Sequence, residues 1–169
     1  MEVTDVYDAQ KHRKEKTHQR GVPMEIGEYR FVVTVLIFNS QGQLLIQRRH
    51  SDKASWPSYW DYSASGAVIA GETLFEAAER ETREELGISL SLQDIPSRLT
   101  VRFAEGWNEI YFVTKDISLD EITLQASEVT EVAWVDEKEY LRLLETNTFI
   151  PYIYGKSIFD LYRSEQEHY

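Results

Sequence analysis

The chain contains no cysteine among its 169 residues. Disulfides, thiolate zinc sites and a cysteine nucleophile are therefore excluded. It also lacks an apolar run long enough to span a bilayer. Its first ten residues, MEVTDVYDAQ, do not show the basic and then apolar pattern of a signal peptide. These absences lead us to expect a cytoplasmic protein that does not enter a membrane.

Basic residues are also scarce, with 18 Lys and Arg against 29 Asp and Glu, for a net charge of −11. This balance argues against a nucleic-acid polymer as partner, because a phosphate backbone requires a basic surface. A small phosphorylated substrate stays possible, because bound divalent cations can supply local positive charge. The length predicts a single domain over residues 1–169 and leaves the oligomeric state open.

Hydrophobic periodicity predicts alternating strands and helices. Residues 1–20 read as an N-terminal β-hairpin, and Tyr29–Phe38 is apolar on both faces, as a central strand is. Gln43–Arg48 would return as its antiparallel partner. Further strands are expected at Leu99–Ala104, Asn108–Thr114 and Thr130–Val135, and helices at Leu74–Leu86, Glu137–Glu145 and Ser157–Gln166. This order predicts an α+β fold with a mixed central sheet between helices.

The segment Gly66–Ile88, GAVIAGETLFEAAERETREELGI, places its acidic residues unusually. At about 100° per residue from Leu74, Glu84, Glu81 and Glu85 fall near 280°, 340° and 20°, at the edge of the apolar stripe. Carboxylates at this spacing repel one another unless a cation neutralises them. Clustered oxygen ligands suit Mg²⁺ or Mn²⁺, so we predict a metal site here. The alternative is a solvated acidic helix.

Ordered flanks favour the metal site over the solvated helix. Thr73 can cap the helix with Glu76 as its capping-box partner, and Gly87 stands where a helix ends with positive φ. The spacing of the fixed positions resembles the Nudix box, with Thr82 in place of the usual aliphatic residue. Those positions are Gly66, Glu72, Arg80-Glu81, Glu84-Glu85 and Gly87-Ile88.

The resemblance implies a fold and a set of roles. The fold is an α/β/α sandwich in which residues 66–88 form a loop–helix–loop, and the cofactor is Mg²⁺ or Mn²⁺. Glu84 and Glu85 would be the core metal ligands, Glu81 a further ligand or the base that orients water, and the carbonyl at Ser65 would complete the shell. Structural roles inside the box fall to Gly66, Glu72, Arg80 and Gly87, with Glu72 and Arg80 paired.

A second stretch, LLIQRRHSDKASWPSYWDYSASG, resembles the type I isopentenyl diphosphate isomerases, a branch with the Nudix fold. Arg49 and Lys53 stand where that branch holds the substrate diphosphate, although both could be ordinary surface cations. The isomerase chemistry does not carry over. Ser65 replaces the isomerase cysteine and Ala67 replaces its metal-binding histidine. A hydroxyl cannot readily replace a thiol as the acid in that reaction.

A further carboxylate often enters such a site from outside the box. The candidates are Glu109 and Glu128, each of which could also be a surface glutamate. Together these features predict a metal-dependent pyrophosphohydrolase. Its substrate would be a nucleotide or a small metabolite linked to a nucleoside diphosphate. The alternatives are an isopentenyl diphosphate isomerase-like enzyme and a non-catalytic ligand-binding domain of the same fold.

Overall fold

The computed structural model describes residues 2–168, so Met1 and Tyr169 of the predicted domain lie outside the described residues. Residues 2–168 form a two-stranded sheet and a seven-stranded sheet. The strands are β1 (Val3–Tyr7), β2 (Arg13–Gln19), β3 (Arg30–Phe38), β4 (Leu44–Arg49), β5 (Trp60–Asp61), β6 (Ala64–Ala67), β7 (Leu99–Phe103), β8 (Gly106–Thr114) and β9 (Val129–Val135). The helices are α1 (Leu74–Leu86), α2 (Glu137–Glu145) and α3 (Ile158–His168), with short 3₁₀ turns η1 (Leu119–Glu121) and η2 (Gly155–Ser157).

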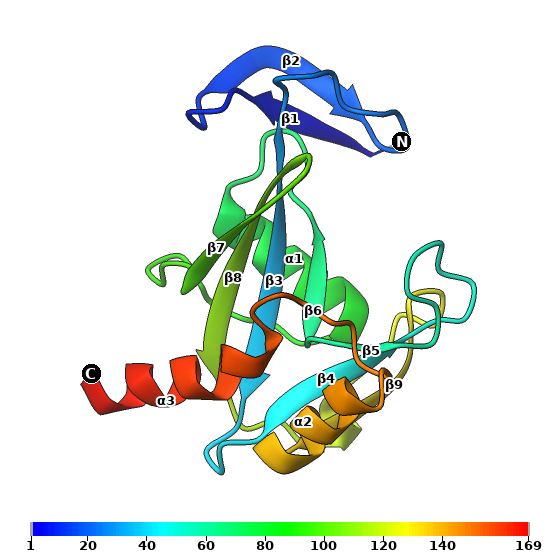
Figure 1. The fold of residues 1–169 in the computed structure, drawn as a ribbon, viewed down its shortest axis with the longest axis vertical. Helices are drawn as coiled ribbons and strands as arrows, with labels where there is room; N and C mark the ends of the chain where they lie inside the picture. Colours follow the sequence, from blue (N-terminus) through cyan, green and yellow to red (C-terminus); the bar gives the residue numbers. More distant parts are fainter. Residues whose placement is uncertain (1, 169) are drawn as a thin grey trace.

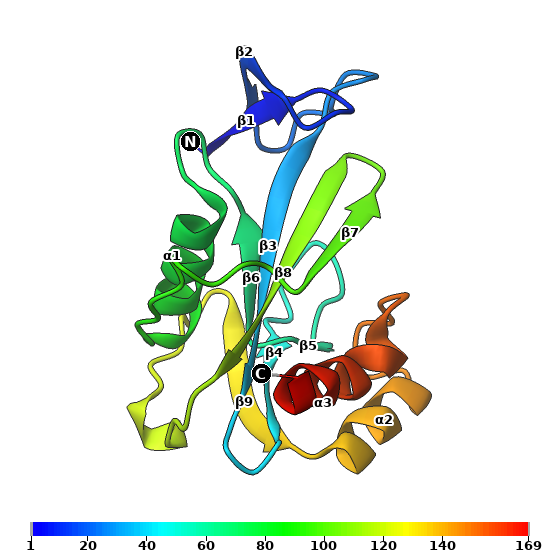
Figure 2. The ribbon, with the colours of Figure 1, turned by 90° about the vertical axis from the view of Figure 1, so that its left-hand side faces the viewer.

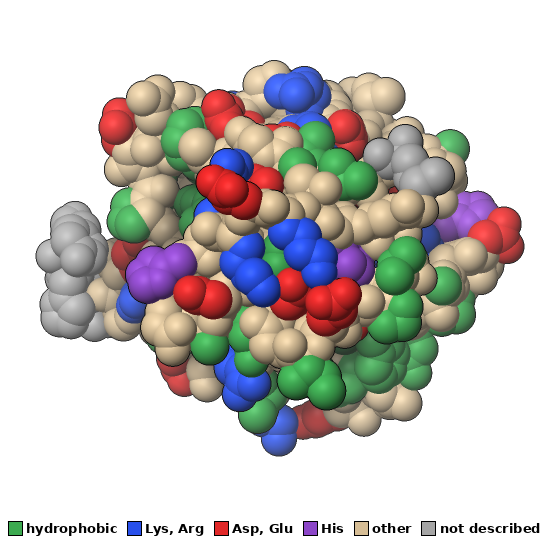
Figure 3. All heavy atoms as spheres, turned by 90° about the horizontal axis from the view of Figure 1, so that it is seen from above, with side chains coloured by type: hydrophobic (Ala, Val, Ile, Leu, Met, Phe, Trp, Pro, Cys, Tyr) green, Lys and Arg blue, Asp and Glu red, His purple; other side chains and the backbone are tan. Residues whose placement is uncertain are grey.

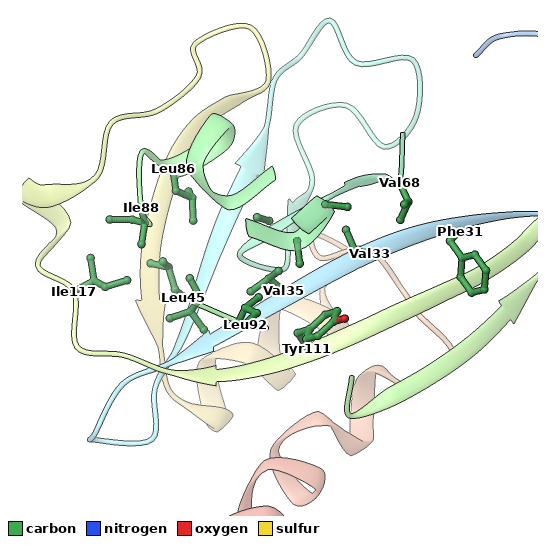
Figure 4. Close-up of a cluster of buried hydrophobic side chains, with 14 of the residues drawn as sticks. Phe31, Val33, Val35, Leu45, Val68, Leu86, Ile88, Leu92, Tyr111 and Ile117 are labelled. Atoms are coloured by element: carbon green, nitrogen blue, oxygen red, sulfur yellow. The ribbon is translucent and has the colours of Figure 1, made fainter. Parts of the chain in front are cut away.

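The large sheet is covered on both faces. Figure 2 shows α1 on one side of it and α2 with α3 on the other, which confirms the predicted α/β/α sandwich. Side chains of β3 alternate between the two layers, because successive residues of a strand point to opposite faces. Val33 and Val35 pack under α1 (Figure 4), whereas Leu36 and Phe38 pack against the cluster that includes α2 and α3. This alternation explains why β3 is apolar on both faces.

Strands β3 and β4 separate soon after the turn that joins them. They pair only at Phe38 and Leu44, after which β4 runs antiparallel to β9 (Figure 1). The expected antiparallel pairing of Gln43–Arg48 with β3 is therefore present but confined to the residues next to the turn. The place beside residues 32–35 is taken by β6, a short strand that the sequence did not predict. The result is a fork between β6 and β4.

The Nudix-box segment begins on a strand. Gly66 lies in β6, so the expected loop–helix–loop is a strand, a loop and a helix. Helix α1 has the predicted bounds, with Thr73 as N-cap and a capping box completed by Glu76. It ends at Gly87, whose φ is 67°. Thr82 is fully buried and its hydroxyl donates to the carbonyl of Ala78, so the departure from the motif is accommodated inside the helix.

The predicted N-terminal hairpin is present as β1 and β2 and lies at one end of the large sheet (Figure 1). It is attached through main-chain hydrogen bonds between Tyr7 and Tyr29 of 2.8 and 3.0 Å, and through the Ala70 amide donating to the Val3 carbonyl. Helix α2 has the predicted bounds, and α3 begins at Ile158. Within residues 2–168 no helix is long and apolar enough to cross a membrane.

Candidate active site

A cleft of about 1180 Å³ opens beside α1 and β6. Its walls come from parts of the chain that are far apart in sequence: the end of the N-terminal hairpin, the loop after β4, the residues before β9 and the segment before η2. The face seen from the hairpin end carries acidic and basic side chains side by side (Figure 3). The negative net charge is therefore not gathered into one acidic patch on this face.

Two box glutamates are buried against the strand at the fork. Glu81 and Glu85 are each 8% exposed and line the cleft. A Cβ atom at Gly66 would lie 2.1 Å from the carboxyl carbon of Glu81. Any larger residue at this position would displace the Glu81 carboxylate, which is a steric reason for glycine here. The predicted position of Glu81 and Glu85 at the edge of the apolar stripe matches this burial.

Both buried carboxylates resist ionisation. Burial, and then the charge of Glu81, raise the pKa of Glu85 to about 8. Burial also raises the pKa of Glu81 to about 7, against the hydrogen bond from Arg80, which lowers it. Removing a charge from water is costly without a partner. A cation between the two carboxylates would offset this cost.

Arg80 holds the box together. Its guanidinium donates to Glu72 at 2.6 and 3.0 Å and to the Ala67 carbonyl at 2.9 Å, so the predicted Glu72–Arg80 pair is present. The same guanidinium donates to Glu81 at 2.7 Å and to the half-exposed Glu84 at 3.3 Å. The Arg80 guanidinium therefore supplies a local positive charge. Glu81 and Glu84, two of the three expected metal ligands, both bind to it.

The predicted phosphate-binding cations belong to the same cleft. Arg49 and Lys53 both line the cleft, as does Glu128, which forms an ion pair with Lys53. Arg49 lies 3.5 Å from the buried carboxylate of Asp61, which also accepts a hydrogen bond from the Tyr152 hydroxyl at 2.8 Å. The fold thus brings these three residues to the same cleft as the box glutamates.

Glu109 lies elsewhere. It is 5% exposed, and both of its carboxylate oxygens accept hydrogen bonds from the Thr100 hydroxyl, with a further bond of 2.5 Å from Ser97. It is absent from the cleft wall. The strand alternation places it with Trp107 and Tyr111, on the face of β8 that packs under α1. This placement favours Glu128 over Glu109 as the further carboxylate.

The sequence reading missed several cleft residues and one residue behind them. Thr34, Asn108 and Phe103 line the cleft, and so does Tyr152. Nothing in their local pattern marked them, because Thr34, Asn108 and Phe103 meet only through the pairing of β3, β7 and β8, and Tyr152 comes from the segment before η2. Gln47 lies behind Glu85 and did carry a signal: it is the first polar residue after the apolar run that begins β4.

A divalent cation fits this donor set chemically. Three carboxylates at the i, i+3 and i+4 positions of α1 offer the oxygen ligands that Mg²⁺ and Mn²⁺ prefer. Within the part of the chain that the structure describes, no three His, Asp or Glu side chains converge as a ready-made metal site. The reason is visible in the contacts, because Glu81 and Glu84 turn to Arg80 and Glu85 turns to Gln47.

Known proteins resemble this chain along its whole length. Residues 28–154 match the NUDIX domain. An uncharacterised Nudix hydrolase of Listeria innocua is 40% identical, with 100% of both chains covered. An isopentenyl-diphosphate Delta-isomerase of Corynebacterium diphtheriae is 28% identical over 80% of this chain and 76% of its own. The crystal structure of DR0079 from Deinococcus radiodurans shares the fold, with a TM-score of 0.74 at 23% identity over 96% of this chain and 98% of that one.

Proposed function

The chain belongs to the Nudix family, and we propose that it is a divalent-metal-dependent pyrophosphohydrolase. Its substrate class would be nucleotides or small metabolites linked to a nucleoside diphosphate. One observation carries this proposal above the others. The buried carboxylates of Glu81 and Glu85 open onto the same cleft as Arg49 and Lys53. That arrangement places candidate cation ligands and candidate phosphate-binding residues in one cleft, where a diphosphate and its divalent cation would bind together.

The reaction adds water across a phosphoric anhydride. An oxygen of water forms a bond to phosphorus, the bridging P–O bond breaks, and the departing phosphate takes the electron pair while water gives up a proton. A bound Mg²⁺ or Mn²⁺ supplies charge neutralisation of the phosphoryl oxygens and acidifies water in this chemistry. Glu81, Glu84 and Glu85 would hold it, with the Ser65 carbonyl beside them. Glu84 must turn from Arg80 to do so.

Arg49 and Lys53 would bind and position the substrate. Arg49 offers a planar set of donors that suits phosphate oxygens, and its contact with Asp61 limits its movement. Lys53 adds a point charge. A phosphate that binds Lys53 competes with Glu128 for it and frees that carboxylate to accept the proton of water. With Glu109 outside the cleft, Glu128 is the further carboxylate of this proposal.

Isomerisation of isopentenyl diphosphate is the second function to weigh, since an isomerase is among the relatives. That chemistry requires an acid to protonate a carbon–carbon double bond. Ser65 and Ala67 occupy the strand at the fork where such a group would stand, and neither side chain can donate that proton at neutral pH. The cleft favours hydrolysis for this reason.

A substrate panel in ¹⁸O-water tests the proposal. Nucleotides, nucleotide sugars, dinucleotides and isopentenyl diphosphate would be incubated with Mg²⁺ or Mn²⁺, and the products read by mass spectrometry. We expect metal-dependent cleavage with one ¹⁸O atom incorporated into a product phosphate, lost in Glu84→Gln and retained in Glu139→Gln, a matched change on α2. Conversion of isopentenyl diphosphate without cleavage would establish the isomerase. Ligand binding without any turnover would overturn both enzymes.

A further inference from the structure

Gln47 is a buried amide in a strand of otherwise apolar core residues. It is 4% exposed, follows Leu44, Leu45 and Ile46 in β4, and precedes Arg48 at the strand's exposed end. It lies outside the Nudix box. Burying an amide costs free energy unless its polar atoms find partners. The partners that Gln47 has are therefore informative.

The side-chain nitrogen of Gln47 makes two hydrogen bonds. It donates to the Ser63 carbonyl at 3.0 Å and to Oε2 of Glu85 at 2.5 Å. A main-chain carbonyl can only accept, so the amide orientation is fixed with its nitrogen, and not its oxygen, toward both partners. Gln47 therefore donates a hydrogen bond to Glu85, and Oε2 of Glu85 is the acceptor.

The Gln47 amide is held in place by hydrogen bonds at the fork between the strands. The Ser63 hydroxyl donates to the Leu45 carbonyl at 2.6 Å and accepts from the Ile37 amide at 2.9 Å. Ser63 therefore joins β3 to β4 at the place where the two strands separate. The Gln47 side chain reaches through this fork from β4 to α1, and its amide is bonded to the same Ser63 residue.

The hydrogen bonds distinguish the two oxygens of Glu85. Oε2 accepts from Gln47 and, at 3.3 Å, from the Ser65 amide. Among the described residues no donor reaches Oε1. Since Glu85 lines the cleft, Oε1 is the oxygen left for a ligand. Replacing Gln47 by an apolar residue would leave Oε2 without its shorter hydrogen bond and free the carboxylate to rotate.

We propose that Gln47 is a positioning residue that fixes the Glu85 carboxylate so that its second oxygen faces the bound divalent cation. This inference rests on the proposed function, because it takes Glu85 as a metal ligand. Partners of this kind orient a ligand without touching the metal, and their loss typically weakens binding by about 10- to 100-fold.

Direct Mn²⁺ binding tests the inference without substrate. The wild type, Gln47→Met and Gln47→Asn would be titrated with Mn²⁺, and the free ion measured by electron paramagnetic resonance. Methionine has similar length but no donor, and asparagine keeps the amide but is too short to reach Glu85. We expect both variants to bind Mn²⁺ about 10- to 100-fold more weakly. The KM for substrate at saturating Mn²⁺ should change much less than the metal affinity.

Tyr140→Phe is the control for general loss of stability. It removes buried hydrogen bonds to Tyr62 and to the Gly155 carbonyl, within the hydrophobic cluster that includes α2 and α3. Its Mn²⁺ affinity should equal that of the wild type. Wild-type affinity in a folded Gln47→Met or Gln47→Asn protein would overturn the role of Gln47 alone. A wild-type protein that binds no Mn²⁺ would overturn the proposed function as well.

Discussion

Two glutamates of this protein are almost equally buried and yet differ in what surrounds them. Glu109 is 5% exposed and uses both carboxylate oxygens as acceptors from hydroxyl groups. Glu85 is 8% exposed, accepts donors on one oxygen only, and has its pKa raised by burial to about 8. The first is a satisfied core residue. The second is a buried acid with an oxygen to spare beside a cleft, and this difference marks a functional group more clearly than burial does.

The largest expected effect follows from removing the charge of Glu85. Glu85→Gln keeps the size of the side chain but removes a proposed metal ligand. We expect the metal-dependent hydrolysis rate to fall by about 10²- to 10³-fold, the range found when one organised electrostatic group is lost. Steady-state kinetics at saturating Mg²⁺ would measure it. If Glu85→Gln retains the wild-type kcat, Glu85 is not a ligand of the catalytic metal.

The stability of the metal-free protein should depend on pH through the same residues. Folding raises the pKa of Glu81 to about 7 and of Glu85 to about 8, from ordinary values near 4.5. The folded state therefore binds these protons more tightly than the unfolded state. Their stabilising contribution is complete below pH 4.5 and is lost as pH rises through about 7 and 8.

Chemical denaturation of the metal-free protein between pH 5 and 9 would measure this loss, which we expect to reach a few kcal/mol in the free energy of unfolding. Saturating Mg²⁺ should restore stability at the alkaline end, because the cation binds the ionised carboxylates. Glu85→Gln should flatten the pH dependence. A metal-free protein that is equally stable across this range would show that the two carboxylates are not coupled to folding.

Glu109 should show the opposite behaviour to Glu85. Glu109→Gln removes the charge from a carboxylate whose oxygens serve Ser97 and Thr100. We expect a loss of about 1–3 kcal/mol in the free energy of unfolding, since buried hydrogen bonds are disturbed, with kcat nearly unchanged. Urea denaturation and the hydrolysis assay would be run on one preparation. A folded variant with strongly reduced kcat would return Glu109 to the list of catalytic candidates.

The sequence predicted those elements whose structure is determined by residues close to them in the chain. Helix α1 was predicted to the residue because Thr73, Glu76 and Gly87 define its ends. The burial of Glu81 and Glu85 followed from helical periodicity. Strand β6 was missed because its four residues, ASGA, are small and carry no alternating pattern. It is recognisable as a strand only beside β3.

The choice between Glu109 and Glu128 could not be made from local pattern either. Both candidates followed plausible motifs, but their positions depend on strand register. The pairing of β8 with β3 places Glu109 opposite Val33, under α1. The residues before β9 instead carry Glu128 to the loop that holds Lys53. Long-range pairing of this kind leaves no trace in a short segment of sequence.

The smallest expected effect concerns the more exposed wall of the cleft. Lys53 forms its ion pair with Glu128 where both side chains are partly open to solvent, so the pair itself contributes little to stability. If Lys53 binds a phosphate equally in the ground state and the transition state, Lys53→Ala should raise KM by about 10-fold and leave kcat within about 2-fold. Lys156→Ala, a change in η2 at a residue that does not line the cleft, is the matched control. A fall in kcat without a change in KM would instead show that Lys53 acts in the transition state, and would link Lys53 to the chemistry proposed for Glu81 and Glu85.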